Sequence, residues 1–105
     1  MKFIICFLFL IPLANANDLC SRYEAKPRYT KALHVVAEFM NLGFQELCNL
    51  SDVLDIEAQP SRIVTRNGDV IPHVQVQLHK AYSSCLFKVN DGEESVSEHR
   101  CYSGF

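Results

Sequence analysis

Cysteine is the residue type in this chain with the widest choice of chemistry, because a thiol can serve as a nucleophile, as a metal ligand or as half of a disulfide. Apart from Cys6, which lies in an apolar leader, the cysteines are Cys20, Cys48, Cys85 and Cys101. No Cys-x-x-Cys pair, as found in zinc sites, occurs among them. An even set with this wide spacing predicts two disulfides. Cys20 with Cys48 and Cys85 with Cys101 would close the shortest loops, but the sequence leaves the pairing open.

The candidate acids and bases near neutral pH are the histidines at positions 34, 73, 79 and 99. His73 and His79 lie in an alternating segment, so they share one face of a strand at a separation of about 20 Å. Because that distance is too great for a shared metal ion, we expect exposed or half-buried sheet residues and no metal site. No Gly-x-Ser-x-Gly, His-Glu-x-x-His or phosphate-binding glycine motif is present. We therefore expect no catalytic residues, no cofactor and no enzyme activity.

The first segment of the chain has the composition of a cleavable secretory signal. Lys2 precedes an apolar run of about ten residues, which is too short to cross a bilayer core of about 30 Å as a helix. Ala14-Asn15-Ala16 then supplies the small-x-small pattern that signal peptidase accepts, which predicts cleavage before Asn17. We expect residues 1–16 to be a signal peptide and residues 17–105 to be one secreted, extracellular domain without a membrane segment.

The charge balance argues against nucleic acid as a partner. The chain carries 10 Lys and Arg against 12 Asp and Glu, a net charge of −2 at pH 7. Loss of Lys2 with the signal peptide makes the remaining domain more acidic. Because nucleic acids and acidic membrane surfaces bind basic patches, we expect neither to be a partner of the domain.

One amphipathic helix is predicted in the first half of the domain. From Lys31 to Leu47, apolar residues recur at spacings of three and four, which is the helical period. Thr30 can cap its first turn, or Pro27 can begin it one turn earlier. The polar cluster at 49–51 is expected to end it.

Alternation of apolar and polar residues takes over after this helix and predicts strands at 53–57, 62–65, 74–80, 86–89 and 95–100. Asn67-Gly68 predicts a type I′ hairpin, because both central positions of that turn need positive φ, and residues 90–94 predict a second hairpin. If Cys20 bonds Cys48, residues 20–30 must return nearly extended along a helix about 25 Å long, which predicts a first strand there. This order of elements predicts an α+β fold with one long helix packed on an antiparallel meander, stapled by two disulfides.

Several segments of the chain together carry a likeness to a known family. They are Arg62-Ile63-Val64-Thr65-Arg66 before Asn67-Gly68, the segment 74–78 leading to Ser83-Ser84-Cys85, the strand 86–89, and Cys101. With the order of elements, they resemble the cystatins, whose first hairpin carries Gln-x-Val-x-Gly. Val64 matches the central valine of that motif. The resemblance covers roughly residues 30–102 and implies a cystatin-like sheet wrapped around the helix.

The resemblance also implies a function. Cystatins inhibit papain-like cysteine proteases by laying an N-terminal segment and two hairpin loops into the active-site cleft as a reversible wedge, and we expect the same of a monomeric domain here. The protease-binding residues that it implies are Arg62, Ile63, Val64, Thr65 and Arg66. The chain departs from the family in the two arginines, in the absence of Trp, and in a segment 17–20 without glycine. An arginine in a cleft without an acidic partner costs roughly several kcal/mol of desolvation, so the alternative is a non-inhibitory secreted binding domain on the same scaffold.

Two further features each have two interpretations. Asn49-Leu50-Ser51 is an N-glycosylation sequon, whereas Asn49 also suits the end of a helix as a C′ residue, and both roles are compatible. Arg62 and Arg66 either recognise an acidic partner or act as strand-end charges that discourage edge pairing.

Overall fold

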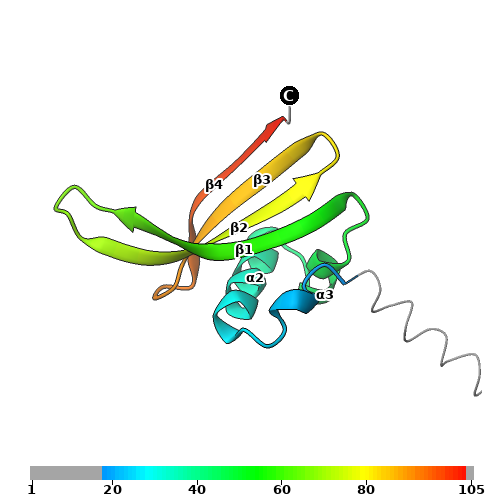
Figure 1. Ribbon diagram of the computed structural model, residues 1–105, viewed down its shortest axis with the longest axis horizontal. Coiled ribbons are helices and arrows are strands. Elements are labelled where there is room, and N and C mark those ends of the chain that lie inside the picture. The colour runs from blue at the N-terminus through cyan, green and yellow to red at the C-terminus, as the bar shows by residue number, and fades with distance from the viewer. Residues whose placement is uncertain (1–17, 104–105) are drawn as a thin grey trace, which may run out of the picture.

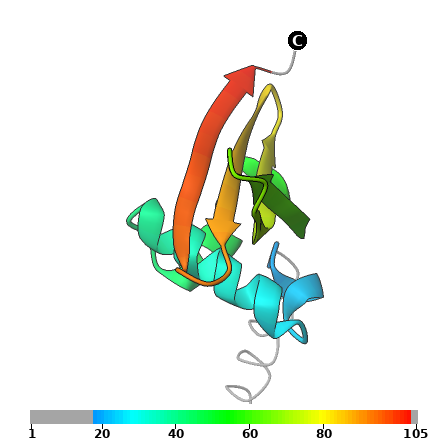
Figure 2. The same cartoon turned by 90° about the vertical axis from the view of Figure 1, so that its left-hand side faces the viewer.

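The computed structural model describes residues 18–103, which form one helical layer against one sheet. The predicted signal peptide, residues 1–16, and its cleavage site lie outside the described residues. The elements, in chain order, are η1 (Ser21–Tyr23), α2 (Pro27–Phe39), α3 (Phe44–Cys48), β1 (Val53–Val64), β2 (Val70–Lys80), β3 (Ser83–Asn90) and β4 (Ser95–Ser103). The strands form a 4-stranded antiparallel meander in the order β1-β2-β3-β4, and α2 packs across one face of it (Figures 1 and 2). The predicted α+β class with an antiparallel meander is confirmed.

The predicted single helix over 31–47 is wrong in its length, because the helix is broken in two. Pro27 takes the first helical position of α2, where its missing N–H would have no partner in any case. After the C-cap, Asn41 adopts φ 61°, its N–H bonds Glu38 O at 3.0 Å, and Leu42 N–H bonds Ala37 O at 2.8 Å. These two bonds are the Schellman pattern, which satisfies the last carbonyls of a helix and stops it.

A short second helix, α3, then continues the same apolar period in a new direction. It follows Gly43, whose N–H donates to the Glu46 carboxylate at 2.9 Å. Leu47 and Cys48 of α3 are fully buried, as Leu33 and Val36 of α2 are. Both helices therefore cover the same core, which explains why the apolar pattern runs through the break.

The core lies between α2 and the face of the sheet that it covers. The helix contributes a buried stripe, Ala32, Leu33, Val35, Val36 and Ala37. The sheet contributes Ile56, Ala58, Val74, Val76, Leu78, Phe87 and Val89. Each fully buried large aliphatic or aromatic side chain contributes about 1.5–3 kcal/mol, so this contact is the main source of the fold's stability.

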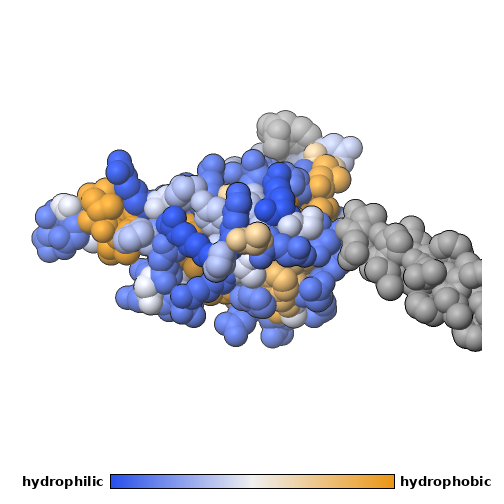
Figure 3. All heavy atoms as spheres, turned by 60° about the horizontal axis from the view of Figure 1, so that its bottom comes forward, coloured by the Kyte–Doolittle hydropathy of each residue, from blue (hydrophilic) through white to orange (hydrophobic). Residues whose placement is uncertain are grey.

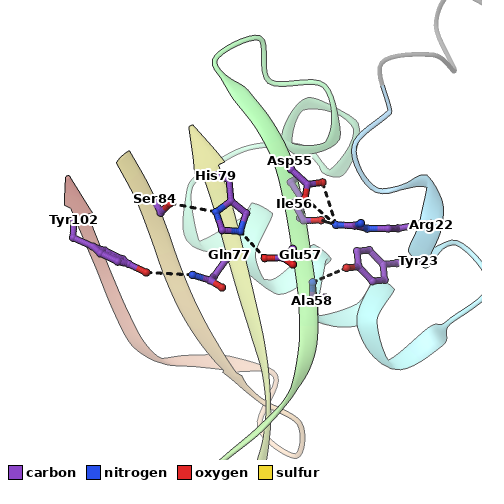
Figure 4. A network of polar contacts seen from close by, with 10 residues as sticks. All are labelled: Arg22, Tyr23, Asp55, Ile56, Glu57, Ala58, Gln77, His79, Ser84 and Tyr102. Carbon is purple, nitrogen blue, oxygen red and sulfur yellow. Dashed lines mark hydrogen bonds and ion pairs between the residues drawn. The ribbon is translucent and has the colours of Figure 1, made fainter. Parts of the chain in front are cut away.

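The predicted first strand in residues 20–30 is wrong, because these residues form η1 and the start of α2. Since α3 turns back from α2, Cys48 reaches Cys20 without an extended return segment. Side chains from η1 take the place of a strand at the outer edge of β1 (Figure 4). The buried Tyr23 hydroxyl accepts the Ala58 N–H at 2.8 Å, and Arg22 donates to Ile56 O at 2.6 Å.

Arg22 also forms an ion pair with Asp55 on β1, with an N to O distance of 3.1 Å. Partial desolvation lowers the pKa of Arg22, but the neighbouring Tyr23 and Asp55 raise it by more, so its pKa lies above the ordinary value. Arg22 therefore stays charged and keeps its contacts to the edge of β1 at every physiological pH.

The structure contains two disulfides, Cys20–Cys48 and Cys85–Cys101, the pairing that closes the shortest loops. The first ties the start of the described chain to the end of α3. The second joins residues that lie directly opposite each other on β3 and β4, near the open end of that hairpin. Within residues 18–103, no helix is long and apolar enough to span a membrane.

Replacement of Tyr23 by Phe tests the side-chain cover of β1. The variant keeps the buried ring but leaves the Ala58 N–H without its partner, and we expect a loss of about 1–3 kcal/mol in the free energy of unfolding, measured in urea. Tyr29→Phe is the matched control, because the Tyr29 ring packs edge-on against Tyr23 at 5.7 Å but its hydroxyl makes no hydrogen bond within the described residues. Equal losses in the two variants would contradict the assignment.

Candidate functional site

The most distinctive feature of the molecule is a two-stranded arm that projects beyond the sheet. Pairing between β2 and β3 ends at His73 opposite Asn90, whereas pairing between β1 and β2 continues to Val64 opposite Val70. We call residues 62–72 the arm. It extends past its last contact with β3 by roughly 15–20 Å, at about 3.3 Å per strand residue, and Figure 1 shows it clear of the other elements.

The tip of the arm is a three-residue loop and not the predicted type I′ turn. Gly68 N–H bonds Thr65 O at 3.0 Å, and Thr65 N–H bonds Asp69 O at 2.9 Å. Gly68 has φ 88°, whereas Asn67 is not in the positive-φ region. This is a type I turn followed by a left-handed glycine, which also suits a hairpin. The Thr65 hydroxyl accepts the Asp69 N–H at 3.1 Å, so Thr65 helps to shape the turn.

Behind this polar tip, the arm carries a band of four aliphatic side chains. Val64 and Val70 form a cross-strand pair on one face, and both are 57% exposed. Ile63 and Ile71 form the neighbouring pair on the other face and are half-buried. Figure 3 shows an apolar patch on the projecting arm, set apart from the body by polar surface. Such an exposed apolar patch on a small domain is a candidate interaction surface.

Arginines lie on either side of this band. Arg62 is opposite Pro72 at the base of the arm, and Arg66 is in the loop at its tip. Both side chains are exposed, and neither forms an ion pair with any group in residues 18–103. The predicted protease-binding residues, Arg62 to Arg66, are thus all brought together on the arm. The sequence places Val70 and Ile71 on the returning strand of this hairpin, but the predicted binding residues did not include them.

The base of the arm is held by a cluster of polar contacts that we call the base clamp. Arg28, in the first turn of α2, donates through Nε to Asp91 Oδ2 at 2.9 Å and through Nη2 to His73 O at 3.1 Å. Asp91, in the β3–β4 turn, donates its backbone N–H to Pro72 O at 3.3 Å. The Pro72 carbonyl, which faces the side where β3 ends, therefore gains a partner from the β3–β4 turn, and Arg28 ties α2 to the same turn and to the His73 carbonyl.

His73 completes the base clamp from within. Its side chain is 1% exposed, with Nδ1 at 2.9 Å from Ile71 O and Nε2 at 2.8 Å from Ser97 Oγ. Because a carbonyl only accepts, Nδ1 carries a proton, and in the neutral ring Nε2 accepts from the Ser97 hydroxyl. The prediction of an exposed or half-buried His73 is wrong. The contact between His73 and Ser97 occurs where β4 has a bulge opposite Lys88 and Val89. No sequence pattern predicts this bulge.

The resemblance implies two further parts of the wedge, the N-terminal segment and the second hairpin loop. Neither the described N-terminal residues nor that loop lies beside the tip of the arm. The described chain begins next to α3, where Leu19 N–H bonds Cys48 O at 2.8 Å, at the end of the molecule opposite the arm (Figure 1). The β3–β4 turn contacts the base of the arm through Asp91, not its tip. Of the three implied parts, the arm alone projects beyond the sheet in the described residues.

A cleft of about 280 Å³ lies beside the base clamp, between α2 and the β3–β4 turn. Its apolar lining includes Ala32 and Val35, and its rim includes the ion pair Lys31–Glu94, with an N to O distance of 2.9 Å. Because these rim charges are already paired, the cleft offers no unbalanced charge to a polar ligand.

A second polar network crosses the open face of the sheet (Figure 4). His79 Nε2 lies 2.6 Å from Glu57 Oε1, and its Nδ1 lies 3.3 Å from Ser84 Oγ. On the same face, Gln77 donates to the Tyr102 hydroxyl at 3.2 Å. Glu57, His79 and Ser84 follow one another as the carboxylate, imidazole and hydroxyl of a hydrolase relay do. Because β3 is an inner strand whose backbone N–H groups bond the neighbouring strands, none of these N–H groups is free to stabilise an oxyanion. The network serves to tie the strands together.

The remaining predicted groups have clear positions. His34 is exposed and stacks on Phe44, with ring centroids 4.0 Å apart. The potential ligand clusters around Cys85 and around Cys20 in the described chain each contain a disulfide, so their sulfur atoms are already bonded to each other. Asn49 is exposed at the end of α3, where its side-chain amide donates to Gln45 O at 2.8 Å. The sequon is therefore accessible, and Asn49 is a C-cap and not a C′ residue.

Replacement of Ser97 by Ala tests whether the base clamp orders the arm. The change leaves a buried nitrogen of His73 without a partner, so we expect a loss of about 1–3 kcal/mol in the free energy of unfolding. We also expect faster amide hydrogen exchange in residues 62–72. Ser95→Ala, at an exposed position of the same strand, is the control. Unchanged exchange in the arm of Ser97→Ala would show that the clamp does not order it.

No protein-family model, curated protein or solved structure significantly matches this chain. The resemblance to the cystatins therefore stays a prediction from the residues quoted for it.

Proposed function

We propose that this chain is a secreted, cystatin-like inhibitor that inserts its arm into the active-site cleft of a papain-like cysteine protease and blocks it reversibly. The observation that carries the proposal is the arm itself, a projecting hairpin with exposed aliphatic side chains on a narrow, two-stranded support. The predicted signal peptide and the two disulfides agree with an extracellular site of action.

The aliphatic band supplies the binding energy in this proposal. Val64 and Val70 stand next to each other on one face of the arm, so a cleft wall that covers one also covers the other. Burial of a fully exposed valine is favourable by about 1.5–3 kcal/mol. Because the base clamp already orders the arm, little conformational entropy is lost when it binds.

The arginines set the specificity in this proposal. Arg62 and Arg66 are exposed and lack an internal counter-charge, so their desolvation opposes binding to a neutral cleft. An acidic rim on the protease would compensate that cost and would speed association. The target is therefore a protease whose cleft is apolar inside and acidic at its edge.

The alternative is a non-inhibitory secreted binding domain that uses the same arm. The position of the described N-terminal residues favours it, since they lie beside α3 at the opposite end from the arm. Such a domain needs an apolar, acidic-rimmed groove on its partner, but the groove need not be an active site.

Steady-state inhibition of a panel of papain-like proteases by the oxidised, secreted chain separates the two functions. We expect competitive inhibition of at least one member. Val64→Asp should weaken it by about tenfold to a hundredfold, because a charge replaces a buried valine. Leu54→Asp is the matched control, since Leu54 is an exposed aliphatic residue of β1 outside the arm. No inhibition by the folded protein would contradict the inhibitor and leave the binding domain.

A further inference from the structure

The two outer edges of the sheet differ in what covers them. At the edge of β1, the Ala58 N–H and the Ile56 carbonyl are bonded by Tyr23 and Arg22. At the other edge, β4 pairs with β3 on its inner side, and no element of residues 18–103 pairs with its outer side. An uncovered strand of this length is a template for pairing with another strand.

The register of β3 and β4 shows which backbone groups β4 presents. Cys101 lies opposite Cys85 with a Cα–Cα distance of 4.0 Å, the short spacing of a non-hydrogen-bonded pair. The N–H and C=O of Cys101 therefore point away from β3, and by the period of two so do those of His99. His99 thus offers both a donor and an acceptor at the open edge.

The charges beside His99 fit a second copy of the same strand. Glu98 precedes His99, Arg100 follows it, and both side chains lie on the open face, where they pair with each other at 3.2 Å. In an antiparallel pair of β4 strands with a two-fold axis at His99, each Glu98 lies opposite the other copy's Arg100. An axis at Arg100 would instead place like charges together. In this register the charges of one copy therefore complement those of the other.

An aromatic group lies at the same position on the helical face. His99 stacks on Phe87, with ring centroids 4.6 Å apart, and Phe39 packs edge-on against His99 at 5.2 Å. Phe39 is the last residue of α2 and is 51% exposed. A two-fold axis at His99 places this aromatic cluster of one copy beside the same cluster of the other copy. The cluster then supplies apolar contact at the centre of the paired strands.

We propose that the β4 edge is a homodimer interface, in which two chains pair antiparallel strands about a two-fold axis at His99. This inference is independent of the proposed function and replaces the expected monomer. The two sheets then form one continuous sheet with both α2 helices on the same face. Because β1 and β4 are opposite edges, both arms stay free in the dimer.

Sedimentation equilibrium of the full oxidised chain and of charge variants tests this register. We expect the wild-type protein to show twice the monomer mass, and Glu98→Arg and Arg100→Glu each to show the monomer mass, because each places like charges opposite one another. An equimolar mixture of these two variants, and the double variant Glu98→Arg/Arg100→Glu, should both restore the dimer, since opposite charges again face each other.

Arg62→Glu is the control, because it makes the same change of charge on the distant arm and should leave the dimer intact. Exchange of the His99 amide proton should slow as the protein concentration rises. A monomeric wild type, single variants that still dimerise, a mixture that stays monomeric, or loss of the dimer in Arg62→Glu would each overturn the proposal. Recovery of the dimer in the mixture would show that each single variant is folded and that its loss of the dimer came from charge.

Discussion

The structure depends most on how β2 is held where it leaves the sheet. Beyond His73 the strand no longer has β3 beside it, and its carbonyl groups on that side need other partners. Arg28 and Asp91 bind the carbonyls of His73 and Pro72, and the buried His73 ring bridges Ile71 and Ser97. A two-stranded hairpin is marginal alone in water, so these contacts convert an extension of the sheet into a fixed arm. The direction in which Val64 and Val70 are presented follows from them.

The opposite end of the molecule is organised by the fold-back of α3. Asn41 stops α2, α3 returns, and the Cys20–Cys48 disulfide fastens η1 beside the sheet. Tyr23 and Arg22 then cover the edge of β1, which leaves β4 as the uncovered edge of the described sheet. One helix packed across one sheet thus separates two surfaces, the arm on β1 and β2 and the edge of β4. An interaction at one of them does not obstruct the other.

Much of this arrangement follows from the sequence alone. Alternation in 74–80 and the turn at Asn67-Gly68 place the sheet and the arm, because a period of two and a glycine turn are local signals. The helix break at Asn41 is hidden, since the apolar period continues through α3 in a new direction. The burial of His73 and the cover of β1 by Tyr23 come from residues distant in sequence, and no local pattern encodes them. The base clamp is therefore the part of the site that required the structure.

Backbone ¹⁵N relaxation of the oxidised protein tests directly whether the arm is ordered before any partner binds. We expect an ordered arm, with order parameters of about 0.85 for the amides of 62–64 and 70–71, equal to those of the body of the sheet. Order parameters below about 0.6 along these segments would contradict it. The arm would then be a flexible hairpin whose ordering opposes binding, and the base clamp would not have the role assigned to it.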